Sequence, residues 1–115
     1  MFGRSNSGSD VAPAEAIDRQ KAGAVLLDVR EDDEWAAGHA PGAVHLPLSR
    51  VGISVARFQN QEILTVCRSG GRSLRAAKQL ADAGIDVHNV SGGMTSWESS
   101  GLPVVRDDGS RGSVG

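Results

Sequence analysis

The chain has 115 residues, which is enough for one domain with a single core and too few for two domains of ordinary size. Its formal net charge of −2 at pH 7 gives no electrostatic case for binding nucleic acid or an anionic membrane surface. A single cysteine excludes an internal disulfide, and no Cys and His spacing indicates a metal site, so neither a metal nor another cofactor is expected.

Both ends of the sequence are polar and rich in glycine and serine. Residues 1–9 and 106–115 are therefore predicted to be flexible tails around a domain that spans 10–105. The first residues contain no apolar run of signal-peptide length, and no later run is long enough to span a membrane. A cytoplasmic location is the resulting expectation.

Between the tails, short apolar runs alternate with segments of helical periodicity. In chain order the pattern predicts helix 14–20, strand 24–29, helix 32–37, strand 43–46, helix 50–57, strand 63–66, helix 72–83, strand 87–90 and helix 94–99. This alternation predicts an α/β domain with a mainly parallel sheet and helices on both faces. In such folds the functional residues gather at the carboxyl ends of the strands.

Two charged residues, Asp28 and Arg30, stand at the end of the first apolar run. A charge in this place is costly unless it finds a partner. Two interpretations remain open, because such a pair either supports a functional site or forms an ordinary ion pair at a strand end. The glycines and the proline of 38–42 then predict a turn, beneath which Trp35 is expected to pack.

The only cysteine, Cys67, directly follows the apolar run 63–66 and precedes the helical pattern 72–83. Two glycines in the intervening segment let the backbone curl with its N–H groups inward, and the next helix adds the positive end of its dipole. An anion should therefore be favoured here, which predicts a nucleophilic thiol of lowered pKa. The candidate binding residues are Arg68, Ser69, Gly70, Gly71, Arg72 and Ser73. The alternative is a buried free cysteine without chemical function.

The length of this loop bears on the kind of anion. Protein tyrosine and dual-specificity phosphatases resemble the arrangement, but they place five residues between the cysteine and the arginine. Here four residues separate Cys67 from Arg72, and the position one step further is Ser73. A tighter ring suits a single sulfur atom on the cysteine better than a tetrahedral phosphoryl group.

Three separated motifs resemble those of the rhodanese family of sulfurtransferases, in the same order, over about residues 11–105. They are Leu27-Asp28-Val29-Arg30 with Glu34-Trp35 and Gly38-His39-Ala40-Pro41-Gly42-Ala43; Cys67-Arg68-Ser69-Gly70-Gly71-Arg72; and Gly92-Gly93-Met94 with Trp97, Gly101 and Pro103. The resemblance implies a single rhodanese-like domain whose five-stranded parallel sheet includes a short strand near 10–12. It also implies that Asp28 and Arg30 support the active loop without taking part in the chemistry.

The resemblance further implies sulfur transfer by double displacement. The Cys67 thiolate would take the outer sulfur of a small anionic donor such as thiosulfate and hold it as a persulfide until an external thiol, a protein acceptor or cyanide removes it. Loop amides would hold the terminal sulfur, while Arg68 and Arg72 would bind the oxyanion of the donor. The competing interpretation is a rhodanese-like sulfur carrier or partner-binding module with low turnover.

Overall fold

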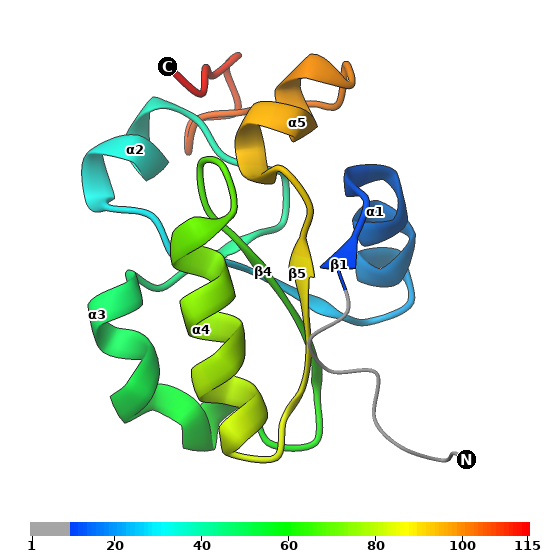
Figure 1. Ribbon diagram of the computed structural model, residues 1–115. Helices are drawn as coiled ribbons and strands as arrows, with labels where there is room; N and C mark the ends of the chain where they lie inside the picture. Colours follow the sequence, from blue (N-terminus) through cyan, green and yellow to red (C-terminus); the bar gives the residue numbers. More distant parts are fainter. Residues whose placement is uncertain (1–9) are drawn as a thin grey trace.

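Five parallel strands form one central sheet in the computed structural model, which describes residues 10–115 (Figure 1). The predicted tail 1–9 lies outside the described residues. The order across the sheet is β1 (Asp10–Val11), β5 (Asp86–Val90), β4 (Glu62–Val66), β2 (Val25–Asp28) and β3 (Val44–His45). All four strand pairings are parallel, which confirms the predicted α/β class and places the carboxyl ends of the strands at one edge.

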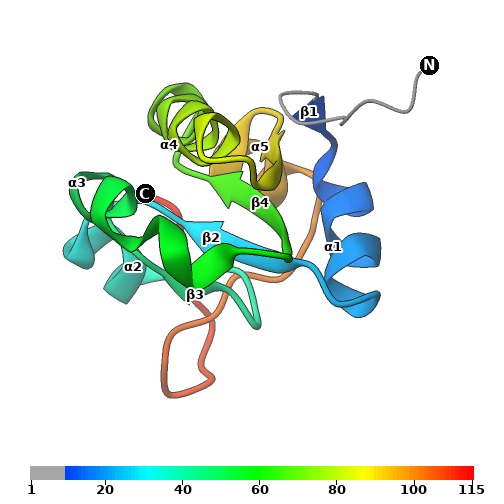
Figure 2. The same ribbon diagram turned by 90° about the horizontal axis from the view of Figure 1, so that it is seen from below.

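Helices cover both faces of this sheet, as the alternating pattern predicts (Figure 2). One face carries α1 (Pro13–Lys21) and α5 (Gly93–Ser99), and the other carries α3 (Leu48–Val51), the 3-10 helix η1 (Gly52–Phe58) and α4 (Gly71–Asp82). The remaining helix, α2 (Asp32–Ala37), joins β2 to β3. The helix predicted over 50–57 starts earlier and tightens into the 3-10 form at Gly52, a residue with low helix propensity.

Alternate side chains of the central strands enter two separate cores. Leu27 and Ile63 pack on the face covered by α4, whereas Leu26 and Leu64 pack on the face covered by α1 and α5. Trp97 fills the second core, and its indole N–H donates a hydrogen bond of 2.9 Å to a backbone carbonyl. No helix within residues 10–115 combines the length and apolar character needed to cross a membrane.

The polar segment 106–115 folds back on the domain. The amide of Ser113 donates to the carbonyl of Ala37 at 2.9 Å, and Val105 forms an antiparallel bridge with His39 just before the segment. A β-carbon on Gly112 would lie 2.6 Å from the α-carbon of Gly38, so this approach requires glycine. That segment 106–115 is flexible stays a prediction. Its backbone contacts with the domain could not be predicted from the amino-acid composition.

Asp28 and Arg30 form a fully buried ion pair where β2 ends. Nε and one terminal nitrogen of Arg30 donate to the two carboxylate oxygens at 2.9 and 2.7 Å. The same guanidinium donates to the carbonyl oxygens of Gly38 at 2.8 Å and Glu34 at 3.4 Å. Within residues 10–115 neither side chain hydrogen-bonds to the segment 67–73. The pair therefore fixes the path of α2, and its effect on the active loop is indirect, through that helix and through the amide of Val29, which donates to the carbonyl of Val66 beside Cys67.

Replacement of the buried carboxylate tests this support. Asp28→Ala leaves the buried guanidinium of Arg30 without a counter-charge, so the free energy of unfolding should fall by about 3–5 kcal/mol in urea denaturation. Asp18→Ala removes an exposed carboxylate from α1 and should change it by less than about 0.5 kcal/mol. Equal, small losses in the two variants would contradict the structural role of the pair.

Candidate active site

Cys67 lies at the carboxyl end of β4, where the chain leaves the sheet and turns into α4. The residue is only 1% exposed and belongs to the core beneath α4. Gly70 ends the turn with φ +120°, a conformation that side-chain-bearing residues rarely adopt. The backbone therefore curls over the sulfur, as the two glycines of this segment predict, and α4 begins at Gly71.

Hydrogen-bond donors surround the sulfur atom. The amide of Gly70 lies 3.1 Å from Sγ of Cys67, and the hydroxyl of the buried Ser73 lies 3.3 Å from it. Burial raises the pKa of the thiol, but hydrogen bonds from the Ser73 hydroxyl and from the amides of Ser73, Gly70 and Ser69 outweigh burial and lower the pKa. The pKa of Cys67 is thus lowered, as the sequence predicts, and hydrogen bonds are the main cause.

Two buried polar side chains support this loop from below. The hydroxyl of Thr65 donates to the carbonyl of Ser73 at 3.0 Å and lies 3.3 Å from the amide oxygen of Asn89. Thr65 and Asn89 are register partners on β4 and β5, and both are buried. The sequence prediction did not include them in the site. A polar residue inside each apolar strand run was the available signal, because buried polar groups need partners.

The start of α5 holds the loop from a third side. The amides of Met94 and Thr95 donate to the carbonyls of Cys67 and Arg68 at 2.7 and 2.9 Å. A β-carbon on Gly93 would lie 2.4 Å from the carbonyl oxygen of Cys67, and the φ of Gly93 is +59°. Only glycine permits this approach, which gives the glycine pair of the third motif a physical reason.

Arg72 is bound by a carboxylate from α2. Its two terminal nitrogens donate to the two carboxylate oxygens of Glu34 at 2.6 and 2.8 Å. These hydrogen bonds lower the pKa of Glu34 to about 2 and raise the pKa of Arg72. Glu34 also accepts a hydrogen bond from the amide of Glu31, which closes a capping box at the start of α2. The sequence prediction placed Glu34 in a motif and assigned it no role in the site.

The second arginine of the loop points elsewhere. Arg68 is exposed and donates to the carbonyl of Gly115 at 3.1 Å. Within residues 10–115 neither Arg68 nor Arg72 hydrogen-bonds to the sulfur, although the charge of Cys67 contributes to the raised pKa of Arg72. Amides and one hydroxyl therefore make the immediate surroundings of the sulfur, and of the two guanidinium groups only that of Arg72 interacts with its charge.

Comparisons with known proteins agree with this geometry. The rhodanese-like domain family matches residues 12–100. "Thiosulfate sulfurtransferase 16, chloroplastic" of Arabidopsis thaliana is 36% identical over 110 residues, covering 84% of this chain and 92% of its own. The "Putative sulfur carrier protein YrkF" of Bacillus subtilis is 42% identical over 74 residues, covering 63% of this chain and 40% of its own. A solved rhodanese-related protein from Thermoplasma volcanium is 28% identical, with TM-score 0.78 over 84% of this chain and 97% of that one.

The hydrogen bonds to the sulfur predict a measurable effect of Ser73. Ser73→Ala removes the hydroxyl that lowers the pKa of Cys67, so the pKa should rise. Iodoacetamide alkylation rates as a function of pH report this pKa, because the thiolate is the reacting form. Ser69→Ala keeps its backbone amide and should leave the profile unchanged. Identical profiles for both variants and the wild type would contradict the assignment.

Proposed function

The chain belongs to the rhodanese-like domain family, and we propose that it is a sulfurtransferase in which Cys67 is the nucleophile. The observation that carries the proposal is a buried sulfur that receives hydrogen bonds from Gly70 and Ser73. Such donors stabilise a thiolate, and they are equally suited to the partial negative charge on the terminal sulfur of a persulfide.

In the first half-reaction the Cys67 thiolate attacks the outer sulfur of thiosulfate. A bond forms between Sγ and that sulfur, and the sulfur–sulfur bond of the donor breaks, with its electron pair leaving on sulfite. No separate general base is invoked, because the hydrogen-bond donors around Sγ lower the pKa of the thiol and so favour the attacking thiolate. The enzyme is left with a persulfide on Cys67, and the loop amides stabilise its outer sulfur.

In the second half-reaction an acceptor thiolate or cyanide attacks the outer sulfur and releases the Cys67 thiolate. The chain has one cysteine, so it cannot resolve the persulfide as an internal disulfide and the acceptor is a separate molecule. A thiol or a protein thiol serves in the cell, with cyanide as a laboratory acceptor. A catalytic thiol that must stay reduced suits a reducing compartment such as the cytoplasm.

We propose thiosulfate as the donor. Arg68 and Arg72 carry planar donor groups that match sulfonate oxygens, and Arg72 binds the carboxylate of Glu34 in the same two-pronged manner. Donor binding at Arg72 therefore competes with Glu34. The name of the Arabidopsis relative supports the same donor.

A sulfur carrier with low turnover is the second candidate, and the relative named as a putative sulfur carrier favours it. Both candidates form a persulfide on Cys67. They differ in steady-state turnover, which the assay of thiosulfate with cyanide measures directly. An aryl phosphate assay on the same sample tests phosphatase chemistry, which the four-residue spacing between Cys67 and Arg72 disfavours.

Replacement of the nucleophile should remove sulfur transfer. Cys67→Ser is nearly isosteric, so the fold should persist by circular dichroism while turnover of thiosulfate falls to the buffer rate. Intact-protein mass spectrometry of wild type treated with thiosulfate should show an increment of one sulfur atom that the variant lacks. Turnover by the variant above the buffer rate would rule out the mechanism.

The two loop arginines should affect the two half-reactions unequally. Arg68→Ala and Arg72→Ala should each lower kcat/KM for thiosulfate by about tenfold to a hundredfold, the worth of one charge-assisted contact of about 1.5–3 kcal/mol. Discharge of a pre-formed persulfide to cyanide should fall by a smaller factor, because no sulfonate is bound in that step. Arg75→Ala changes an exposed arginine on the same helix and is the control. Equal losses in both half-reactions would mean that the arginines shape the loop instead.

A further inference from the structure

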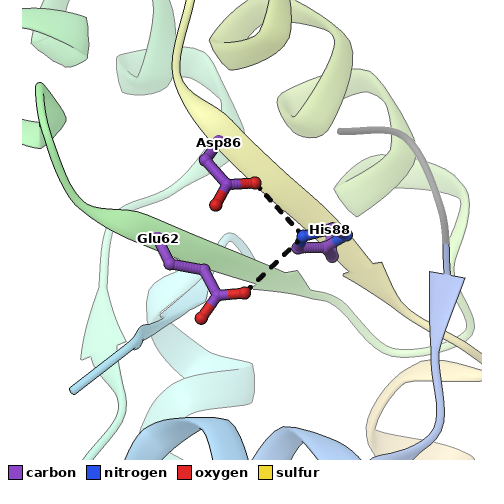
Figure 3. A group of neighbouring side chains, drawn as sticks. All are labelled: Glu62, Asp86 and His88. Atoms are coloured by element: carbon purple, nitrogen blue, oxygen red, sulfur yellow. Dashed lines mark ion pairs between the residues drawn. The ribbon is translucent and has the colours of Figure 1, made fainter. Parts of the chain in front are cut away.

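Three side chains with metal-binding groups, those of Glu62, Asp86 and His88, converge on β4 and β5 (Figure 3). Glu62 and Asp86 begin β4 and β5 and are register partners. His88 follows two residues after Asp86, so its side chain points to the same face of the sheet. Glu62 precedes Cys67 by five residues of extended chain, or about 16 Å. The cluster is therefore separate from the thiol.

The distances within this cluster suit a single ion. Nε2 of His88 lies 3.2 Å from a carboxylate oxygen of Asp86 and 3.6 Å from one of Glu62, and the three ligand atoms all lie within 4.8 Å of one another. Two ligand atoms at about 2.1 Å from a tetrahedral ion are about 3.4 Å apart. The arrangement thus needs little movement to place an ion between its members.

Burial divides the cluster into a fixed and an open side. His88 is 2% exposed, so its imidazole is held in place by the core. The side chains of Glu62 and Asp86 are 29% and 54% exposed, which leaves a path for an ion and for the water that completes its coordination. The set thus combines one rigid ligand with two adjustable ones.

Arg19 of α1 is the cation that competes for this position. Its guanidinium contacts Glu62 and also donates two hydrogen bonds, at 3.0 and 2.7 Å, to Glu15. Because Glu15 alone satisfies two of its donors, Arg19 can release Glu62 and keep a counter-charge. Glu15 and Glu62 contact this one guanidinium, and Asp86 adds a third carboxylate beside His88, so three carboxylates with a single guanidinium leave excess negative charge for a divalent cation.

We propose that Glu62, Asp86 and His88 form a binding site for a divalent transition-metal ion of the zinc type. Imidazole nitrogen and carboxylate oxygen are both ligands of such ions, and three protein ligands leave a position for water, whereas Mg²⁺ and Ca²⁺ prefer oxygen ligands throughout. The bound ion links the first residues of β4 and β5. Sequence spacing did not indicate the site. Glu62 comes from a different strand, and Asp86 and His88 lie on the same face only because side chains alternate along β5.

Zinc titration of the full chain carrying Cys67→Ser tests the site without competition from the thiol. Calorimetry should show one ion per chain, and Asp86→Asn and His88→Gln should each weaken binding more than about a hundredfold, because even outer partners of metal ligands are worth 10–100-fold. Asp82→Asn removes another exposed carboxylate, with 69% side-chain exposure, and should leave binding unchanged. Zinc should also raise Tm in the parent and in Asp82→Asn, and should not do so in Asp86→Asn.

The Asp86→Asn variant should fold even if His88→Gln does not, because the side chain of Asp86 is exposed and lies outside the core. Its zinc affinity therefore tests the proposal on its own. Arg19→Gln is an independent arm, since removal of the competing cation should tighten zinc binding. No binding to the Cys67→Ser chain, or binding that survives Asp86→Asn, would overturn the proposal and leave an ion-pair network around His88. Unchanged affinity in Arg19→Gln would exclude Glu62 as a ligand and overturn the three-ligand site.

Discussion

Burial of the Cys67 sulfur is the constraint on which the rest of the site depends. A thiolate withdrawn from water is stable only if hydrogen-bond donors replace the lost solvent, and Gly70 and Ser73 supply them. Those donors are in place because the loop is held from below by Thr65 and from the side by the close approach of Gly93. The chemistry of one atom thus accounts for the glycines and buried polar residues around it.

Around this centre, a chain of ionic contacts connects the buried edge of the sheet to the loop. Asp28 fixes Arg30, Arg30 donates to the backbone carbonyl of Glu34 in α2 and to that of the residue after the helix, and the side chain of Glu34 holds Arg72. Each contact alone has an ordinary structural role. Together they set the position of the Arg72 guanidinium. In the proposed mechanism this group binds either the carboxylate of Glu34 or the anionic donor.

Sequence patterns predicted most of the fold and the centre of the site. Helical and strand periodicity located the elements around β4 and α4 within a few residues, because both have clear apolar faces. Cys67 was identifiable as the single cysteine between them. The partners of Arg72 and Arg68 could not be identified from the sequence, since Glu34 and Gly115 meet these arginines only through tertiary packing. Thr65 and Asn89 were missed although each is a polar residue within an apolar strand run, because their contact with each other and with the loop is set by tertiary packing, as is the pairing of Glu62 with His88.

The order of the strands has a consequence for association between molecules. The two edge strands, β1 and β3, have two residues each, whereas the strands between them have four or five. An edge of two residues offers few unpaired backbone groups to a strand from another chain, which is one way in which proteins discourage edge-to-edge aggregation. The apolar central strands therefore lie between short edges that offer little template for fibril growth.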